Sequence, residues 1–286
     1  MTRRSVILLG GRGFIGSALA QRLQRIGQPF YVVGRAEIGQ LDALLEQAGT
    51  LVHLASSTTP GASASQPERE LGNIELSMRL TDKLQKHPDV QLVFFSSGGT
   101  VYGNPSTLPV TEEAPTAPLS NHGAAKVAQE AFCHTLRARG HAVTILRPSN
   151  AYGPGQGLKS GFGLVRTMLE HARQGTTLQI WGDGDNVRDY IYIDDIVDAT
   201  LRLIQAPENA GVYNLGCGVG HSVNQVRALV EKVTGLPVNA VYAAARGIDV
   251  RSVVLCRKRL ESQCGWQPLT TLEIGIAKTW HWSQTQ

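Results

Sequence analysis

Hydrophobic residues form short, largely β-branched runs along the first half of the chain, and longer amphipathic segments separate them. The runs are SVILLG, PFYVVG, GTLVHLA, VQLVFFSS and HAVTILR. Each is apolar on both faces, as the strands of a parallel sheet must be when helices cover both sides. The segments between them, such as FIGSALAQRLQRI and AAKVAQEAFCHTLRAR, repeat apolar residues at helical spacing. The alternation predicts an α/β fold with a doubly wound parallel sheet and right-handed crossovers.

Two features of the pattern refine this prediction. The connection between the second and third runs is short for such a fold, which predicts that one strand is reduced or missing. After residue 150 the Gly- and Pro-rich segment AYGPGQGLKSGFG leads into a helix ending near Gly175 and helices beginning near Asp194, Ser222 and Leu272. We therefore predict a sheet domain over residues 1–150, to which segments near 190–216 return, and a smaller C-terminal lobe over most of residues 151–286.

Composition excludes several classes of protein. The chain has 286 residues, 42% of them hydrophobic and 17% charged, and its net charge of +4 includes no run of five like charges. This argues against a nucleic-acid or membrane-surface partner. The four cysteines have neither CxxC nor metal-ligand spacing, so we expect reduced thiols and no metal site. The apolar run near the N-terminus is too short for a signal core or a membrane span, and we expect a cytoplasmic protein.

A glycine-rich turn follows the first predicted strand directly and opens a helix. In GGRGFIGSALAQRL, Gly10 permits the tight turn, Gly13 lets the backbone approach a pyrophosphate, and Gly16 lets helix and strand pack closely. The N-terminus of the helix supplies N–H donors to the phosphates. A strand–helix turn without a ligand is the alternative, but the position in the first βαβ unit favours a dinucleotide site.

The choice of dinucleotide depends on the end of the second strand. An acidic residue there would bind a ribose 2′-hydroxyl and select NAD. The strand ends VVGRAE, which places Arg35 where the acid is expected. Arginine can bind a 2′-phosphate, and Arg12 would add positive charge, so the balance favours NADP. Glu37 lies close by and keeps NAD open.

Taken in order, the motifs resemble those of the extended short-chain dehydrogenase/reductases, in the branch of NAD(P)-dependent nucleotide-sugar epimerases, dehydratases and 4-keto reductases. The resemblance runs nearly end to end, through GGRGFIG, LVHLAS, FFSSGGTVYG, LRPSNAYGPGQG, WGDGDNVRDYIYIDD, YNLGCG and ARGID. It implies an NAD(P)-binding Rossmann domain over residues 1–150 and a substrate-binding lobe over most of residues 151–286. It also implies further cofactor contacts, at Phe14, Ile15, Leu54, Ala55 and Lys126.

The catalytic positions of this family are only partly matched. The family's helix begins Tyr-x-x-x-Lys, and Lys126 matches the lysine that binds the nicotinamide ribose, but His122 stands at the tyrosine position. A Ser or Thr four residues before the tyrosine of V-Y-G is also expected, and this position is Gly98. The resemblance therefore leaves Ser97 or Thr100 to supply the missing hydroxyl.

Two interpretations of His122 stay open. Imidazole titrates near neutral pH, and the nearby Lys126 cation disfavours imidazolium, so the ring could serve as the general base. Alternatively His122 only tops its helix, and the protein binds the cofactor and a nucleotide sugar with little turnover.

Substrate contacts follow from the resemblance. Asn73 and Asn150 match substrate-binding positions, and Arg188 and Arg246 match arginines that clamp a nucleotide diphosphate. Paired guanidinium contacts suit a diphosphate. The implied partner is a UDP- or dTDP-sugar, and helices over residues 68–86 and 121–139 are expected to form a homodimer.

The function predicted first is NAD(P)-dependent 4-epimerisation of a UDP-sugar. An NADP-dependent 4-keto-sugar reductase is the alternative within the same class, and a catalytically impaired binding protein is the alternative outside it. A dehydratase is disfavoured because Gly98 and Gly99 stand where it would need an acidic pair.

Overall fold

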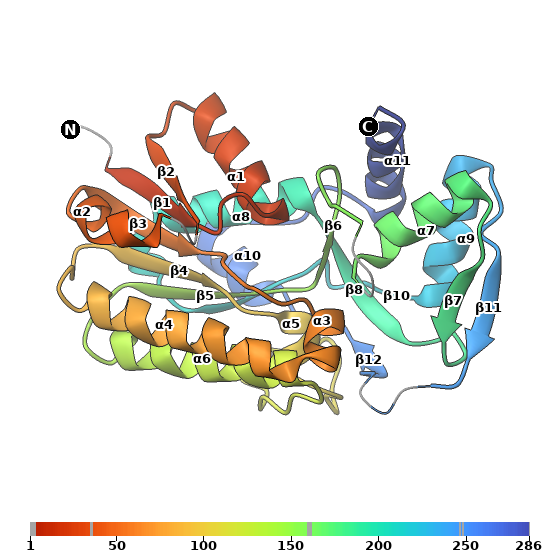
Figure 1. The fold of residues 1–286 in the computed structure, drawn as a ribbon, viewed down its shortest axis with the longest axis horizontal. Coiled ribbons are helices and arrows are strands. Elements are labelled where there is room, and N and C mark those ends of the chain that lie inside the picture. The colour runs from red at the N-terminus through yellow and green to blue at the C-terminus, as the bar shows by residue number, and fades with distance from the viewer. Residues whose placement is uncertain (1–3, 35–36, 159–161, 246, 248, 286) are drawn as a thin grey trace.

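The computed structural model describes residues 4–34, 37–158, 162–245, 247 and 249–285. Its centre is a parallel six-stranded sheet with the strand order β2-β1-β3-β4-β5-β9 (Figure 1). The strands are β1 (Ser5–Leu9), β2 (Phe30–Val33), β3 (Ala48–His53), β4 (Gln91–Phe95), β5 (Val143–Pro148) and β9 (Val212–Leu215). The predicted doubly wound α/β fold is confirmed.

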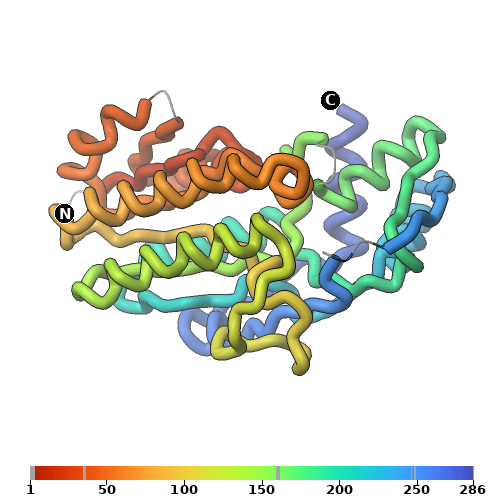
Figure 2. Tube along the Cα trace, turned by 60° about the horizontal axis from the view of Figure 1, so that its bottom comes forward, coloured from red at the N-terminus to blue at the C-terminus, as the bar shows by residue number. Residues whose placement is uncertain are grey.

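Helices bury both faces of this sheet, and β1 shows why its sequence is apolar throughout. Val6 and Leu8 pack into one hydrophobic cluster, while Ile7 and Leu9 pack into another on the opposite face. The first face is covered by α1 (Phe14–Arg25), α8 (Ile193–Gln205) and α10 (Lys258–Cys264), and the second by α2 (Leu41–Leu45), α4 (Glu70–Leu84) and α6 (Asn121–Arg137). Figure 2 shows α4 and α6 lying side by side along the sheet.

The short connection after β2 contains no strand within its described residues 37–47, as the sequence predicts. It holds only η1 (Ile38–Gln40) and α2, and β2 is the edge of the sheet. The chain therefore reverses its direction of winding at β1, and the carboxyl ends of β1 and β3 flank the switch point where doubly wound sheets bind ligands. Shorter elements follow on that side: α3 (Pro60–Ser65), η2 (Pro67–Arg69) and α5 (Gly98–Val101).

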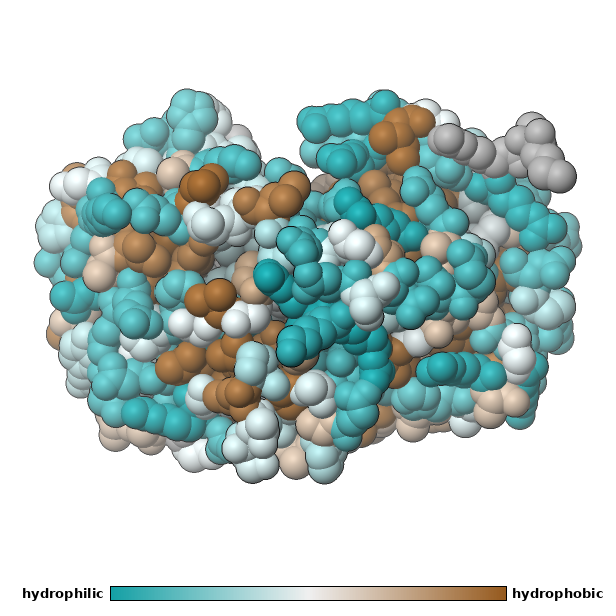
Figure 3. Space-filling model, turned by 180° about the vertical axis from the view of Figure 1, so that it is seen from behind, coloured by the Kyte–Doolittle hydropathy of each residue, from teal (hydrophilic) through white to brown (hydrophobic). Residues whose placement is uncertain are grey.

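The second part of the chain builds a smaller lobe, on the right of Figure 1. Its strands are β6 (Asn150–Tyr152), β7 (Leu178–Trp181), β8 (Val187–Tyr192), β10 (Gly220–Ser222), β11 (Ala240–Ala243) and β12 (Ser252–Val253). Its helices are α7 (Leu164–Gln174), α9 (Val223–Thr234) and α11 (Leu272–Ser283), and η3 (Pro207–Asn209) precedes β9. From behind, a notch at the top of the molecule separates this lobe from the sheet domain (Figure 3).

The helix boundaries of the lobe agree with the sequence signals. Gly175 ends α7 in the left-handed conformation with φ +66°, and Ser222 caps α9 with a capping box. The returning strand β9 pairs with β5, so part of the expected segment near 190–216 does join the main sheet. In the part of the chain that the structure describes, no helix combines the length and the apolar character needed to cross a membrane.

Candidate functional site

The glycine-rich turn brings the end of β1 against the end of β3. Gly10 has φ +86°, and a Cβ atom there would lie 2.6 Å from the backbone nitrogen of Ala55. A Cβ atom on Gly16 would lie 2.5 Å from Gly11 Cα, so only glycine permits this helix–turn packing. Gly13 stands immediately before α1, where no side chain caps the helix. The free N–H groups of the first turn are therefore available to a phosphate.

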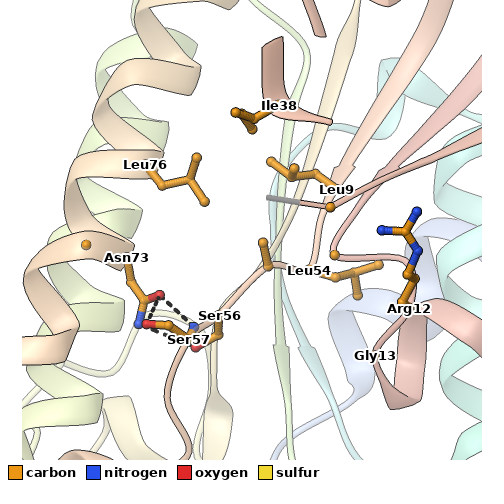
Figure 4. Close-up of a pocket in the computed structure, with 13 residues that line it drawn as sticks. Leu9, Arg12, Gly13, Ile38, Leu54, Ser56, Ser57, Asn73 and Leu76 are labelled. Atoms are coloured by element: carbon orange, nitrogen blue, oxygen red, sulfur yellow. Dashed lines mark hydrogen bonds between the residues drawn. The ribbon is translucent and has the colours of Figure 1, made fainter. Parts of the chain in front are cut away.

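A cavity of about 560 Å³ opens beside this turn, between the sheet and α4. Leu9 and Leu54 lie on the sheet side of it, and Ile38 and Leu76 face them across the gap (Figure 4). Two apolar walls and a glycine turn at one end suit a flat base with its phosphates, so the residues present fit the adenosine half of a dinucleotide. Of the residues expected to contact the cofactor, Leu54 and Ala55 line this cavity. Phe14 instead lines a neighbouring cavity of about 210 Å³. Ile15 packs against the core.

The mouth of the large cavity carries an ion pair that the sequence did not predict. Arg12 donates to both carboxylate oxygens of Glu37, at 2.8 and 3.0 Å, and the backbone N–H of Gly34 donates to the same carboxylate at 2.9 Å. The hydrogen bond from Arg12 is the main reason why the pKa of Glu37 falls to about 2. A carboxylate is therefore fixed just after β2, beside the glycine-rich turn that carries Arg12. Arg35, the residue expected to select NADP, lies outside the described residues.

His122 is held against a carboxylate from the neighbouring helix. Its Nδ1 lies 3.0 Å from Glu70 Oε1, and the His122 side chain is 8% exposed. Burial and the Lys126 cation lower the pKa of His122, and this outweighs the opposite effect of Glu70. The ring is therefore neutral at pH 7, as expected from Lys126 alone.

Lys126 lies one helical turn further along α6 and points toward the end of β4. Its Nζ donates to the carbonyl oxygen of Phe95 at 2.9 Å and lies 5.0 Å from the centroid of the Phe94 ring. Burial lowers the pKa of Lys126 to about 8. The lysine is thus a buried, partly destabilised cation four residues after the histidine, as the motif requires.

The expected substitutes for the missing hydroxyl stand at the start of α5. Ser97 precedes the helix as its N-cap and is partly exposed, while the Thr100 hydroxyl donates to the Ser97 carbonyl oxygen at 3.5 Å. Gly98 itself is buried, and a Cβ atom there would lie 2.7 Å from the backbone oxygen of Arg147. The structure thus leaves no space at the family's Ser/Thr position.

Tyr102, the tyrosine of V-Y-G, is engaged in a buried network and cannot accept a proton from a substrate. It is 2% exposed, donates to Asn214 Oδ1 at 2.7 Å and accepts from Arg147 Nη1 at 2.7 Å. Arg147 in turn pairs with Glu130, at 2.6 and 3.0 Å. Burial raises the pKa of Tyr102, so it stays a neutral hydrogen-bond donor.

Two of the predicted substrate residues lie on adjacent strands of the lobe. Asn150 begins β6 and pairs with Tyr190 of β8, and Arg188 lies two residues before Tyr190, so the three side chains project from the same face. Arg188 donates only to the carbonyl oxygen of Val187 among the described residues, and burial lowers its pKa. A partly buried guanidinium that makes no hydrogen bond to a carboxylate among the described residues is a good diphosphate ligand. Arg246 lies outside the described residues.

Asn73 has a different environment. Its Oδ1 accepts from the Ser57 backbone N–H at 2.8 Å, and its Nδ2 donates to Thr58 Oγ1 at 2.9 Å and to Glu70 Oε2 at 2.7 Å. Both amide hydrogens are thus used within the protein. Figure 4 shows Asn73 against Ser56 and Ser57 of the loop after β3. Sequence reasoning missed Glu70 and Thr58. The only signal was the spacing of Glu70 and Asn73, three apart on one helix, since nothing in the sequence places α4 against His122.

Comparison with known proteins identifies the family. Residues 6–216 match the NAD dependent epimerase/dehydratase family. UDP-glucose 4-epimerase of Mycolicibacterium smegmatis is 30% identical over 301 residues, covering 96% of each chain. The structure of UDP-glucose 4-epimerase with UDP-glucose from Thermotoga maritima has a TM-score of 0.90 and 30% identity, covering 98% of this chain and 99% of that one. UDP-glucose 4-epimerase from Thermus thermophilus in complex with NAD has a TM-score of 0.88 and 26% identity, with the same coverage. Because the family match spans most of the sequence and both lobes superpose on solved epimerases, the chain belongs to the NAD dependent epimerase/dehydratase family.

Proposed function

We propose that this protein is a 4-epimerase of a nucleotide-diphosphate sugar, with a UDP-sugar as the first candidate, and that His122 is its general base. The observation that carries the proposal is the neutral His122 ring beside Lys126 at the carboxyl end of β4. Its Nδ1 lies against Glu70, and its Nε2 has no hydrogen-bond partner among the described residues. Nε2 is not fully buried, so solvent reaches it.

The residues divide the reaction between them. His122 Nε2 would take the proton of the C4 hydroxyl when C4 is oxidised, and would return it when C4 is reduced from the other face. When bound, NAD supplies the hydride acceptor and then the donor. Lys126 hydrogen-bonds the cofactor ribose and keeps imidazole neutral before the first transfer. Asn150, Arg188 and Arg246 hold the diphosphate, while the sugar turns between the two transfers.

NAD is the cofactor that the described residues favour. A 2′-phosphate would have to displace the Glu37 carboxylate from Arg12 and Gly34, or lie beside it at the cost of like-charge repulsion. A ribose 2′-hydroxyl can instead donate to that carboxylate. The earlier preference for NADP rests on Arg35, and Arg35→Ala tests it: selective loss of NADP affinity would restore that preference.

We further place the protein in the cytoplasm as a homodimer joined through α4 and α6. Leu71 and Met78, seven residues apart on α4, are 67% and 47% exposed, and Ala124 and Ala131 are exposed on α6. A second copy of the same helix pair would cover this apolar surface. Light scattering at micromolar concentration tests the dimer, and a monomer would contradict it.

One observation favours the alternative of a binding protein with little turnover. At Gly98 the structure provides neither a hydroxyl nor space for one, so a hydrogen bond to the reacting oxygen has to come from Ser97, Thr100 or water. An NADP-dependent 4-keto reductase requires that Arg35 attracts the 2′-phosphate of NADP more strongly than the Glu37 carboxylate repels it.

The experiment separates these functions in two steps. The nucleotide released from purified protein by acid is identified first: retained NAD supports the epimerase, and exchangeable NADPH supports the reductase. The protein is then incubated with UDP- and dTDP-hexoses, and the C4 epimers are separated by chromatography, with His122→Ala as the matched control. Interconversion that His122→Ala abolishes supports the proposal. Bound NAD without interconversion of any of these sugars would leave the binding protein as the function.

A further inference from the structure

Glu70 is a buried carboxylate with three side-chain hydrogen-bond partners. It is 5% exposed, accepts from Thr58 Oγ1 at 2.7 Å and from Asn73 Nδ2 at 2.7 Å, and its Oε1 lies 3.0 Å from His122 Nδ1. As the first residue of α4 it also lies at the positive end of the helix dipole. Burial raises the pKa of Glu70, but the three hydrogen bonds outweigh this effect and the pKa lies below its usual value. The carboxylate is therefore ionised at neutral pH.

The direction of each bond around Glu70 is fixed by the next residue outward. Asn73 Oδ1 accepts from the backbone N–H of Ser57, so the Asn73 side chain cannot flip and its NH₂ group must face Glu70. The Thr58 hydroxyl accepts from that NH₂ group at 2.9 Å, so its own proton goes to Glu70. Because an ionised carboxylate only accepts, His122 Nδ1 must carry a proton. In a neutral ring, Nε2 is then the basic nitrogen.

We propose that Glu70 is a positioning residue that holds His122 in the Nδ1–H tautomer, so that a carboxylate–imidazole pair replaces the family's tyrosine as proton acceptor. The inference deepens the proposed function and rests on it. The same logic operates wherever a carboxylate orients a catalytic histidine: it selects the tautomer and stabilises the imidazolium formed after proton transfer. Here the pair comes from two helices, with Glu70 on α4 and His122 on α6.

Glu70→Gln is the informative variant because neither orientation of the new amide reproduces the native pattern. With its oxygen toward His122, the amide NH₂ group would face the NH₂ group of Asn73. With its NH₂ group toward His122, the amide would donate to Nδ1 and force the proton onto Nε2. Because Asn73 is fixed with its NH₂ group toward residue 70, the second orientation is favoured and the tautomer changes. The variant keeps the shape of the side chain, so the packing is conserved.

The direct test is nuclear magnetic resonance of protein labelled with ¹⁵N-histidine, which distinguishes protonated from bare ring nitrogens. The His122 signals are assigned by their absence from His122→Gln. We expect Nδ1–H with bare Nε2 in the native protein, and a shift toward Nε2–H in Glu70→Gln. Nε2–H in the native protein would overturn the inference, even if Glu70→Gln fails to fold.

Turnover provides the second readout. Glu70→Gln should lower kcat by about 10²–10⁴-fold and leave the affinity for NAD and UDP nearly unchanged, because only the base is affected. Glu273→Gln, on the exposed side of α11 in an ion pair with Lys232, is the matched control and should keep native kcat. Equal kcat values for the two variants would also overturn the inference.

The pH profile separates positioning from a merely structural role. The charged groups that act on His122 are Glu70 from α4 and Lys126 from its own helix. Removing the Glu70 charge lowers the pKa of His122, so the residual activity of Glu70→Gln should extend to more acidic pH than native activity. An unshifted acidic limb would show that the carboxylate does not act on the ring. If the native protein has the Nδ1–H tautomer but converts no nucleotide sugar, the epimerase proposal fails while the role of Glu70 in orienting the ring stands.

Discussion

Adding a side chain at Gly98 should destabilise the protein, although the family resemblance of the sequence implies a hydroxyl residue there. A Cβ atom would lie 2.6 Å from Leu255 Cδ1 and 2.7 Å from the backbone oxygen of Arg147. The leucine methyl can rotate away, but the carbonyl belongs to the buried strand β5 and can move only with the strand. Gly98→Ser is therefore an overpacking change and not a simple restoration of the family site.

The expected size follows from that contact. Overpacking a core usually costs about 1–3 kcal/mol. In chains of roughly 150–250 residues each kcal/mol lowers Tm by about 2–4 °C, so Gly98→Ser should lower Tm by about 2–12 °C. Scanning calorimetry of the cofactor-free protein measures the shift.

Gly72→Ala is the matched control, because Gly72 is an exposed helical glycine with no atom within 4 Å of an added Cβ. It should raise the free energy of unfolding by about 0.5–1 kcal/mol, since alanine restricts the unfolded chain. Combining Gly98→Ser with Leu255→Ala should cost less than the sum of the two single changes if the clash with Leu255 contributes. A Gly98→Ser protein that is as stable as the native one and more active would refute the reasoning and indicate that the site accepts the family hydroxyl.

Three further predictions concern the site. His122→Ala should lower turnover about 10²–10⁴-fold without changing UDP affinity. Because the pKa of His122 is lowered, protonation should remove the base, and native activity should fall, only below the ordinary histidine pKa of 6.5. A midpoint above pH 6.5 in the rate profile would argue against this base. Glu37→Ala should weaken NAD and improve NADP binding in calorimetric titrations, and a parallel change for both would contradict the role of its carboxylate. Arg188→Ala should weaken UDP binding about 10–100-fold, the loss of a charge-assisted contact, and leave NAD affinity unchanged; unchanged UDP affinity would remove Arg188 from the substrate site.

The sheet could be predicted because its signals are local. Apolar runs, the glycine turn and the helix start at Ser222 all act within a few residues of the chain, and the structure has an element at each of them. The same holds for the missing strand after β2, which follows from the length of one connection.

The details of the site could not be predicted because they depend on contacts between distant segments. Glu70 meets His122 only because α4 packs on α6, and Leu255 fills the space beside Gly98 only because the chain returns from the second lobe. Glu37 was noticed in the sequence, but its bond to Arg12 depends on how two turns meet. Motif positions therefore predict where the candidate site lies, while its hydrogen-bond geometry depends on tertiary contacts.

The partnership of α4 and α6 makes proton transfer dependent on how two helices are aligned. Gln129 of α6 donates to the Asn73 carbonyl oxygen at 3.0 Å and to Ser77 Oγ at 2.7 Å, both on α4, so it sets the register of the pair. A slide of α4 relative to α6 would change the length and the angle of the Glu70–His122 contact and weaken it. A protein with a tyrosine base carries its proton acceptor on a single helix, whereas here the pKa of His122 depends on how α4 and α6 are aligned. Substitutions at Gln129, remote from any substrate, should therefore alter the pH dependence of the reaction before they alter the fold.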